Sequence, residues 1–444
     1  MTEKLLPLLA GALALSSPAL AAGDPVAALR DAALKDSLAY EITEGLTTEV
    51  GQRLAGTEAE ARARDWGVAR LKALGFSNVR IETFDMPVWV RGEERAEIVS
   101  PFPQKIVLAA LGNSGATPPE GIEAQIVYFP TLADLQAAPD GSLKGKIAFV
   151  SHAMKQTQDG SSYGYFGATR RQGPNIAAKK GAAAIIIRSI GTDSHRVPHT
   201  GSTNFDPGTT PIPAAALSIP DAENLERMLK RDKPLIMKLV LTPRFAGTAK
   251  SGNVIAEVPG SDPSAGIVLI GGHLDSWDLG TGAIDDASGV AITTAAARRI
   301  MAAGKPRRTI RVVWFGAEEY GGFGGAAYQK AHAAENHAVA GESDFGADRI
   351  WRFGIKLAAA AKPVEDRLAA ALAPLGIGRE SGAVHGGTDV TPVIEAGAGT
   401  LSLAQDGTHY FDIHHTADDT FDKVDRDQVA QNVAAWTAAL AVLA

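Results

Sequence analysis

The chain has 444 residues, of which 45% are hydrophobic and 21% are charged. This length and composition are typical of a folded protein with two or three domains, and they exclude a collagen-like or disordered chain. The formal net charge of -7 argues against nucleic acid as the main partner. The chain has no cysteine, which excludes a disulfide framework, a thiolate zinc site and a cysteine nucleophile. Any metal would therefore be bound by His, Asp and Glu.

The N-terminus has the pattern of a secretory signal peptide. Lys4 precedes an apolar stretch, residues 5–20, which is interrupted by two prolines and followed by small residues. We expect cleavage after Ala21, so that residues 1–21 are a signal peptide and the mature protein is periplasmic or extracellular. The alternative is a membrane anchor. The stretch falls short of the about 20 uninterrupted apolar residues that span a bilayer, so we expect no stable membrane anchor after cleavage.

The next 230 or so residues divide into a helical part and a part rich in short strands. In residues 24–86, Thr57 and Glu60 form a capping-box pattern, and the helix that they begin is expected to end at Gly75. A short strand is expected at 78–84. Between about 91 and 250, turn residues separate short apolar runs, which predicts a separate β-rich region with strands at 106–110, 125–129, 146–151, 183–188, 214–219 and 235–241.

From residue 253 onward, strands and helices alternate. The pattern predicts strands at 254–258, 267–271, 310–315 and 400–403, and helices at 288–303 and near 348–375. Such alternation indicates an α/β domain in which helices cover both faces of a mostly parallel sheet.

Polar residues that could carry chemistry follow the predicted strands of this last region. His273 and Asp275 come directly after the strand at 267–271. Ligands bind beyond the carboxyl ends of the strands in an open α/β sheet, so these residues are candidates for a site. His273 could bind a metal and Asp275 could orient it. A hydrogen-bonded loop pair is the ordinary alternative.

Three further groups of acidic residues in this region are also candidates for the site. Asp285 and Asp286 stand at the start of the helix expected at 288–303, where helix capping is the common role of aspartate. Glu318 and Glu319 follow the strand at 310–315, and two adjacent buried carboxylates repel unless a cation or proton compensates them. Asp344 is another acidic position, which by itself would be an ordinary surface residue.

A histidine pair near the C-terminus completes the set. His414 and His415 lie in the sequence YFDIHHTADDT. A histidine here could equally be a satisfied core residue, so this motif alone does not decide between a metal site and the core.

Taken in order, the motifs HLDSWD, GAIDDASG, FGAEEYGG, ESDFG and HHTADDT resemble the metal site of the M28 family of co-catalytic zinc peptidases. The segments WVRGEE, TPPEGI, RSIG and SHRVPHTG extend the similarity, which is to the carboxypeptidase Q branch, over essentially the whole mature chain. The resemblance implies a three-layer α/β/α zinc-exopeptidase domain formed by residues 22–95 and 251–444. It also implies a β-rich protease-associated domain inserted at 96–250, with its two ends close together and its surface over the mouth of the site.

The same resemblance implies a cofactor of two Zn²⁺ ions per chain with five protein ligands. Asp285 would bridge the ions, His273 and Asp344 would bind one, and Glu319 and His415 would bind the other. Oxygen and imidazole ligands without sulfur suit zinc in a catalytic role.

The remaining roles also follow from the resemblance. Glu318 matches the general base, and Asp275 would hold His273 in the ligating tautomer. His414 is not assigned a metal. Residues expected near the substrate are His385, Asp389 and Tyr410, and residues that could recognise a substrate carboxylate are Arg170, Arg171 and Arg188. Ordinary structural or surface roles are the alternative for these residues.

The function implied is that of a secreted dinuclear zinc exopeptidase acting on short peptides, as a dipeptidase or carboxypeptidase. An aminopeptidase with the same site is the close alternative, because the two activities differ in which terminus the pocket walls recognise. A non-catalytic binding protein and a glutaminyl cyclase of the same fold are further alternatives. The partner expected is a peptide, and the sequence leaves open whether the chain is a monomer or a homodimer.

Overall fold

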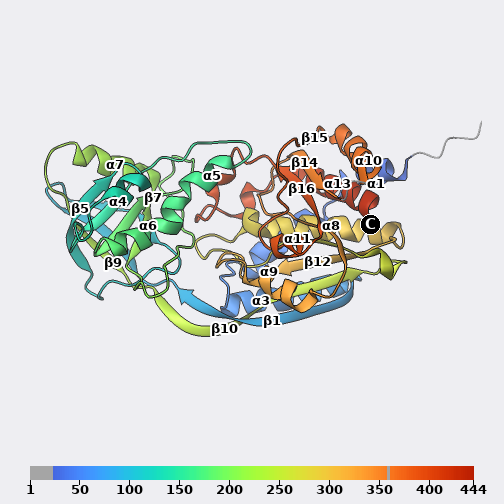
Figure 1. Cartoon of the computed structure of the whole chain (residues 1–444), viewed down its shortest axis with the longest axis horizontal. Helices are drawn as coiled ribbons and strands as arrows, with labels where there is room; N and C mark the ends of the chain where they lie inside the picture. The colour runs from blue at the N-terminus through green and yellow to red at the C-terminus, as the bar shows by residue number, and fades with distance from the viewer. Residues whose placement is uncertain (1–23, 358–360) are drawn as a thin grey trace, which may run out of the picture.

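The computed structural model describes residues 24–357 and 361–444, so the expected signal peptide lies outside the described residues. The chain forms two lobes (Figure 1), each built around an eight-stranded sheet. Residues 24–90, 244–357 and 361–444 form the first lobe, and residues 94–241 form the second lobe. Within the described ranges, no helix has both the length and the apolar character that crossing a membrane requires.

The sheet of the first lobe has a parallel centre. Its strand order is β1-β10-β12-β11-β13-β16-β14-β15. The middle strands β12, β11, β13 and β16 run parallel, whereas β10 and β14 are antiparallel to their inner neighbours. The strands are β1 (Ser77–Val90), β10 (Arg244–Val258), β11 (Ile267–His273), β12 (Thr309–Phe315), β13 (His337–Glu342), β14 (Ile350–Lys356), β15 (Gly378–Arg379) and β16 (Gly399–Gln405).

Helices cover both faces of this sheet, as the sequence predicted. Alternate strand residues face opposite sides, so Val268 and Ile270 pack in one hydrophobic cluster and Leu269 packs in another. The first cluster lies under α1 (Pro25–Ala33), α2 (Leu38–Gly45), α3 (Glu58–Ala73), α8 (Ser288–Ala303), α10 (Lys362–Leu372) and α13 (Arg426–Leu443). The second lies under α9 (Phe323–His332) and α11 (Thr391–Glu395).

The prediction of a helix near 348–375 is wrong for the first part of that range. Residues 350–356 form the strand β14, and α10 begins only at Lys362. The strand pairs with β16 over most of its length, and its buried residues Ile350, Phe353 and Ile355 join the main core. This pairing with a strand more than forty residues away is a tertiary contact, which overrides the local pattern.

The second lobe contains the strands that the short apolar runs predicted, and it also contains helices that the sequence did not predict. Its strands are β2 (Glu94–Ser100), β3 (Gln104–Ile106), β4 (Leu108–Ala110), β5 (Ile122–Phe129), β6 (Ile147–Val150), β7 (Ala184–Arg188), β8 (Ala214–Leu217) and β9 (Ile236–Leu241). Its helices are α4 (Leu132–Ala137), α5 (Ser161–Phe166), α6 (Ala168–Lys179) and α7 (Ile219–Leu229). The helix α6 has few large apolar residues, so helical periodicity was not visible in its sequence.

Two long strands connect the lobes. β1 and β10 pair antiparallel to their ends, where Val90 lies opposite Arg244 (Figure 1). Directly beyond this point, Glu94 of β2 pairs with Leu241 of β9 in the second sheet. The chain therefore enters and leaves the second lobe at adjacent positions.

Candidate metal centre

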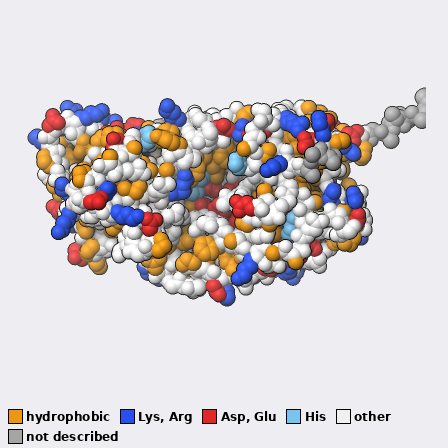
Figure 2. All heavy atoms as spheres, viewed as in Figure 1, with side chains coloured by type: hydrophobic (Ala, Val, Ile, Leu, Met, Phe, Trp, Pro, Cys, Tyr) orange, Lys and Arg blue, Asp and Glu red, His pale blue; other side chains and the backbone are white. Residues whose placement is uncertain are grey.

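The candidate site lies at the carboxyl edge of the parallel strands in the first lobe. β11 ends at His273, the loop after β12 carries Glu319, and the loop after β13 carries Asp344. Asp285 belongs to the turn Ala283–Ala287 that precedes α8, and His415 follows the short helix α12 (Tyr410–Ile413). Neighbouring parallel strands end at one edge, which brings these distant residues together. Figure 2 shows acidic and histidine side chains in a hollow near the centre of the face.

Asp285 lies at the centre of the cluster. Its Oδ1 is 3.0 Å from Nε2 of His273, and its Oδ2 is 3.2 Å from Nε2 of His415. His273 Nε2 is also 3.3 Å from Oδ1 of Asp344, and His415 Nε2 is 3.1 Å from Oε2 of Glu319. The two oxygens of Asp285 therefore face two separate imidazole–carboxylate pairs.

Among the described residues, potential ligand atoms lie close enough to hold a metal ion in three overlapping groups. Within each group these atoms lie within 4.8 Å of one another: Asp285, His414 and His415; His273, Asp285 and Glu319; His273, Asp286 and Asp344. His414, to which the sequence assigned no metal, has its Nε2 3.6 Å from Oδ2 of Asp285, and its ring stacks on that of His415.

The burial and charge of the cluster fit a bound cation. Oδ2 of Asp285 and Oε1 of Glu319 are buried and have no hydrogen-bond partner among the described residues. Burial would raise the pKa of Asp285, but His273 and His415 hold it well below its usual range. A buried carboxylate oxygen is costly unless a proton, a hydrogen bond or a cation satisfies it. The oxygen and imidazole donors are those that catalytic zinc uses.

Glu318, the expected base, is half-buried. It lines a cavity that is also lined by Asp285, Glu319, Asp344 and His415. Burial raises the pKa of its carboxyl well above the usual range, and the carboxylates of Asp344 and Glu319 add to the shift, while His273 opposes it. This direction of shift favours uptake of a proton by the carboxylate, which suits a residue that accepts a proton and passes it on.

Asp275 takes a different position from the one expected. Its backbone carbonyl, 2.9 Å from Nδ1 of His273, is the oxygen that orients the imidazole. Its carboxylate is 3.8 Å from that nitrogen and instead accepts the backbone N–H groups of Glu318 at 3.1 Å and Glu319 at 3.3 Å. A two-residue spacing shows that Asp275 and His273 are close, but it does not show which oxygen makes the contact.

Two further buried carboxylates shape the site without facing the cavity. Asp286 accepts the backbone N–H of His273 at 3.0 Å and that of Gly289 at 3.0 Å. Asp419 accepts the N–H groups of Ala283 and Ile284, both at 2.8 Å. Burial raises the pKa of Asp419 to about 7. Asp419 lies in the motif HHTADDT, but the sequence pattern by itself indicates no role for it.

Both lobes contribute to the walls of the cavity, whose volume is about 340 Å³. Arg170 and Arg171 of α6 lie on the second-lobe side, with Tyr163, Ser202 and Asn204. Neither guanidinium pairs with a carboxylate among the described residues, and Nε of the buried Arg170 has no hydrogen-bond partner there. Sequence reasoning missed the last three of these residues because nothing in the local pattern places them at a site.

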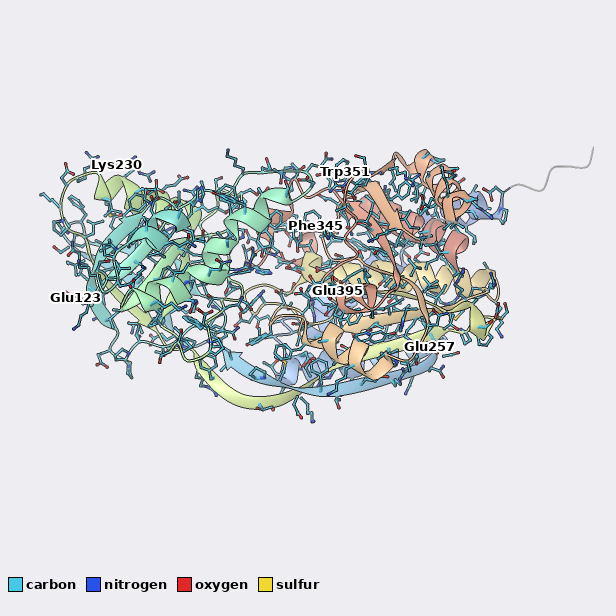
Figure 3. The ribbon with its side chains drawn as sticks, in the orientation of Figure 1. Glu123, Lys230, Glu257, Phe345, Trp351 and Glu395 are labelled. Carbon is cyan, nitrogen blue, oxygen red and sulfur yellow. The ribbon has the colours of Figure 1, made fainter. Side chains whose placement is uncertain are left out.

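Arg188, the third arginine considered, does not reach the cavity. Its guanidinium pairs with Glu223 at 2.8 Å in the second lobe. Figure 3 shows how far the second lobe extends from the site: Glu123 and Lys230 lie at its far end, whereas Phe345, which lines the cavity, lies between the lobes.

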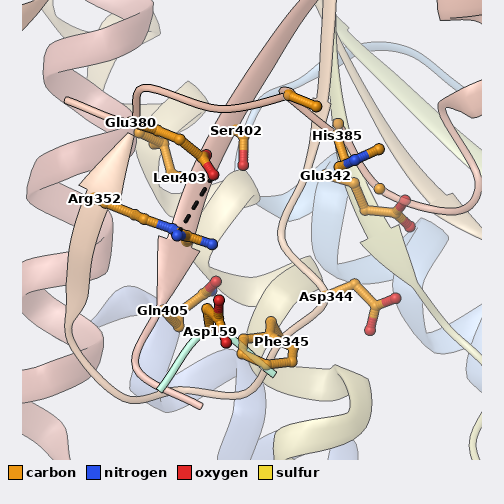
Figure 4. Close-up of a pocket in the computed structure, with 14 residues that line it drawn as sticks. Asp159, Glu342, Asp344, Phe345, Arg352, Glu380, His385, Ser402, Leu403 and Gln405 are labelled. Carbon is orange, nitrogen blue, oxygen red and sulfur yellow. Dashed lines mark ion pairs between the residues drawn. The ribbon is translucent and has the colours of Figure 1, made fainter. Parts of the chain in front are cut away.

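The residues expected near the substrate lie in three different places. Tyr410 is buried in the wall of the main cavity. His385 lines a neighbouring cavity of about 280 Å³, which shares Asp344 and Phe345 with the first (Figure 4). Asp389 is fully buried and accepts the backbone N–H of Gly325 at 3.0 Å, so it supports the fold beside α9 and does not line either cavity.

Comparisons with known proteins show the family to which the chain belongs. The model of peptidase family M28 matches residues 253–440. Carboxypeptidase Q of Bos taurus is 35% identical over 411 residues, which cover 91% of this chain and 85% of that protein. Carboxypeptidase Q of Homo sapiens is 34% identical, with the same coverage.

Solved structures give the same result. The chain is similar to the peptidase M28 precursor from Shewanella amazonensis, with 49% identity, a TM-score of 0.91 and coverage of 94% of this chain and 95% of that one. It shares the fold of a zinc aminopeptidase from Bacillus subtilis, at 21% identity and a TM-score of 0.66, over 91% of this chain and 94% of that one. The chain therefore belongs to peptidase family M28, is of the carboxypeptidase Q type and is a zinc metallopeptidase.

Proposed function

We propose that the protein is a dinuclear zinc exopeptidase that hydrolyses short peptides and recognises their free carboxyl end. The observation that carries the dinuclear part is the position of Asp285, whose two oxygens face His273 on one side and His415 on the other. A bridging carboxylate needs this arrangement.

In this proposal one ion is held by His273, Asp344 and Asp285, and the other by Glu319, His415 and Asp285. When bound, zinc supplies polarisation of the scissile carbonyl and acidification of a water molecule. His273 and His415 each use Nε2 toward the cluster, so Nδ1 is the nitrogen left to fix the ring. The cluster is buried, which keeps bulk water away from the reacting groups.

Glu318 is the residue that transfers the proton during hydrolysis. Its carboxylate faces the cavity and takes the proton of the attacking water, then passes it to the nitrogen of the leaving amine. Asp275 fixes the backbone from which Glu318 projects. Glu319, next in sequence, turns toward His415 and serves as a ligand.

Recognition of the carboxyl end is supported by Arg170 and Arg171, which line the cavity on the second-lobe side. Arg170 and Arg171 are adjacent, so their charges repel, and a substrate carboxylate would relieve that repulsion. Arginine suits this role because its planar fork binds carboxylates in a bidentate manner. Arg170 is buried and donates to the Tyr163 hydroxyl at 2.6 Å, whereas Arg171 is half-buried and donates to the carbonyl O of Gly164 at 2.9 Å. Arg171 is therefore the more available group.

We also propose that the second lobe is a protease-associated domain and that the protein is exported. The lobe lies between two adjacent strand ends and forms one wall of the cavity, which supports the first proposal. Residues 1–21 support the second. The expected mature N-terminus is Ala22, which N-terminal sequencing of the exported protein would test; an unprocessed exported chain would contradict it.

The decisive experiment is product analysis by mass spectrometry on dipeptides and tripeptides with free or blocked ends. Amidation of the carboxyl end should abolish cleavage, whereas acetylation of the amine should be tolerated. The reverse pattern would favour the aminopeptidase alternative. Arg171→Gln should raise KM for free-carboxyl substrates, while Arg188→Gln, outside the cavity, should leave KM unchanged. Zinc analysis of the same preparation should find two ions per chain; one ion at full activity would contradict the dinuclear site.

A further inference from the structure

A short segment of the second lobe, residues 199–202, contacts the proposed ligand His415 on its backbone and on its ring. The N–H of Thr200 donates to the carbonyl O of His415 over 3.1 Å. The carbonyl O of Thr200 lies 3.2 Å from Nδ1 of His415, and Arg170 donates to this same carbonyl over 3.3 Å. Nδ1 is the nitrogen that points away from the cluster. A backbone carbonyl in this position fixes the orientation of a metal-binding imidazole.

The same segment also holds the residue before this ligand. Nδ1 of His199 lies 2.7 Å from the carbonyl O of His414, and Nε2 lies 2.8 Å from Oδ1 of Asp193. The side chains of His199 and Asp193 are completely buried. The backbone N–H of His199 donates to the hydroxyl of Ser189 over 2.8 Å, so the imidazole is fixed within the second lobe.

A third contact reaches the other proposed ligand on this side. The hydroxyl of Ser202 donates to the carbonyl O of Glu319 over 2.6 Å. The segment 199–202 therefore contacts both ligands, Glu319 and His415, that we assign to one of the two ions.

The backbone of His415 needs such support. Its φ of 61° lies in the left-handed region, which is uncommon for a residue with a side chain. A residue persists in this conformation when its surroundings hold it there. The contacts from Thr200 and His199 act on this same stretch of chain.

The opposite side of the cluster is held differently. Nδ1 of His273 lies 2.9 Å from the carbonyl O of Asp275, and the segment that carries Asp344 is joined to β11 by the N–H of Ser343, which donates to Gly271 over 2.9 Å. These partners all belong to the first lobe. Within the described ranges, no second-lobe residue makes a hydrogen bond or ion pair with His273 or Asp344.

We propose that the second lobe is part of the metal site: residues 199–202 form the outer shell of the position bound by Glu319 and His415, whereas the position bound by His273 and Asp344 depends on the first lobe alone. His199 and Ser202 are positioning residues in this arrangement. The two zinc ions therefore differ in how their retention depends on the second lobe. The inference rests on the proposed dinuclear site.

The test uses two substitutions of His199 that differ in which hydrogen bond they keep. The amide nitrogen of asparagine lies where Nδ1 lies, so His199→Asn keeps a donor for His414 and loses the contact with Asp193. The amide nitrogen of glutamine lies where Nε2 lies, so His199→Gln keeps the contact with Asp193 and loses the donor. Ser202→Ala is an independent variant on the other ligand, and Lys179→Gln, an exposed residue of the same lobe, is the control.

The readouts are zinc titration of the metal-stripped full chain by calorimetry and the zinc that remains after dialysis against graded chelator. In His199→Gln, one of the two sites should weaken by roughly 10- to 100-fold, the usual effect of losing an outer-shell partner, and the other should stay unchanged. His199→Asn should be closer to the wild type. Ser202→Ala should weaken the same site more mildly, and Lys179→Gln should weaken neither.

A reference variant identifies the affected site. His415→Ala should remove one site directly, and the site left in it should have the affinity of the site that His199→Gln leaves intact. If the wild type binds two ions and both His199→Gln and Ser202→Ala leave both affinities unchanged, or weaken them equally, the inference is overturned and the dinuclear proposal stands. If the wild type binds only one ion, the dinuclear proposal fails and the inference fails with it.

Discussion

Asp275 allows a specific prediction, because its carboxylate and its backbone carbonyl have different hydrogen-bond partners. The side chain is fully buried, and its two oxygens accept the N–H groups of Glu318 and Glu319 at 3.1 and 3.3 Å. Asp275→Asn keeps the shape of the side chain but has only one oxygen, so one N–H would face an amide NH₂ group. The carbonyl that orients His273 is unchanged.

The expected effect follows from the group that is left without a partner. A buried N–H without an acceptor costs about 1–3 kcal/mol, so the free energy of unfolding should fall by that amount. The backbone that carries Glu318 would also shift. A displacement of about 1 Å at a catalytic group can lower turnover by about 100-fold. Zinc content should stay at the wild-type value, because the substitution removes no proposed ligand side chain and leaves the carbonyl that orients His273 in place.

The measurements are urea unfolding of the zinc-loaded protein, kcat on a dipeptide and zinc content. Burial raises the pKa of Asp275 to about 7, so assays at pH 8 keep the wild-type carboxylate ionised. The control is Asp278→Asn, on the same loop, whose carboxylate pairs with Arg91 and not with Glu318 or Glu319. It should keep wild-type kcat. Loss of zinc in Asp275→Asn, or full activity with unchanged stability, would refute the role given to its carboxylate.

Three other predictions concern the ligands, the metal and a distant ion pair. Glu318→Gln should retain zinc and lose turnover by roughly 100- to 10,000-fold, whereas Glu319→Gln should lose zinc; metal analysis beside kinetics checks this, and the opposite result would exchange the two roles. Chelation should abolish activity and lower the melting temperature, because ligand binding to the native state stabilises it; an unchanged Tm would contradict this. Although burial opposes the effect, His332 and Arg80 hold the pKa of Glu82 below its ordinary value of 4.5. The stability that Glu82 contributes is therefore present above pH 4.5 and lost as the pH falls, so Glu82→Gln should destabilise the protein at about pH 7 and much less at about pH 3; an equal loss in urea unfolding at both pH values would be inconsistent with this.

The sequence by itself was informative in two ways: the residue types limited the possible chemistry, and local patterns predicted individual strands. The absence of cysteine restricted any metal to His, Asp and Glu, and buried strands such as 267–271 were visible as short apolar runs. Polar motifs that follow these strands pointed to one edge of the sheet, because parallel strands end together. The order of these motifs resembles the pattern of family M28, and the comparisons confirmed that membership.

Only the tertiary structure decided which atoms meet. β14 forms because it pairs with β16, and α6 forms with few large apolar residues, so neither followed from local periodicity. The spacing of Asp275 from His273 could not distinguish a carbonyl from a carboxylate. The contact of Thr200 with His415 joins residues more than 200 positions apart. Such contacts depend on how the two lobes pack, and a local sequence pattern carries no information about that packing.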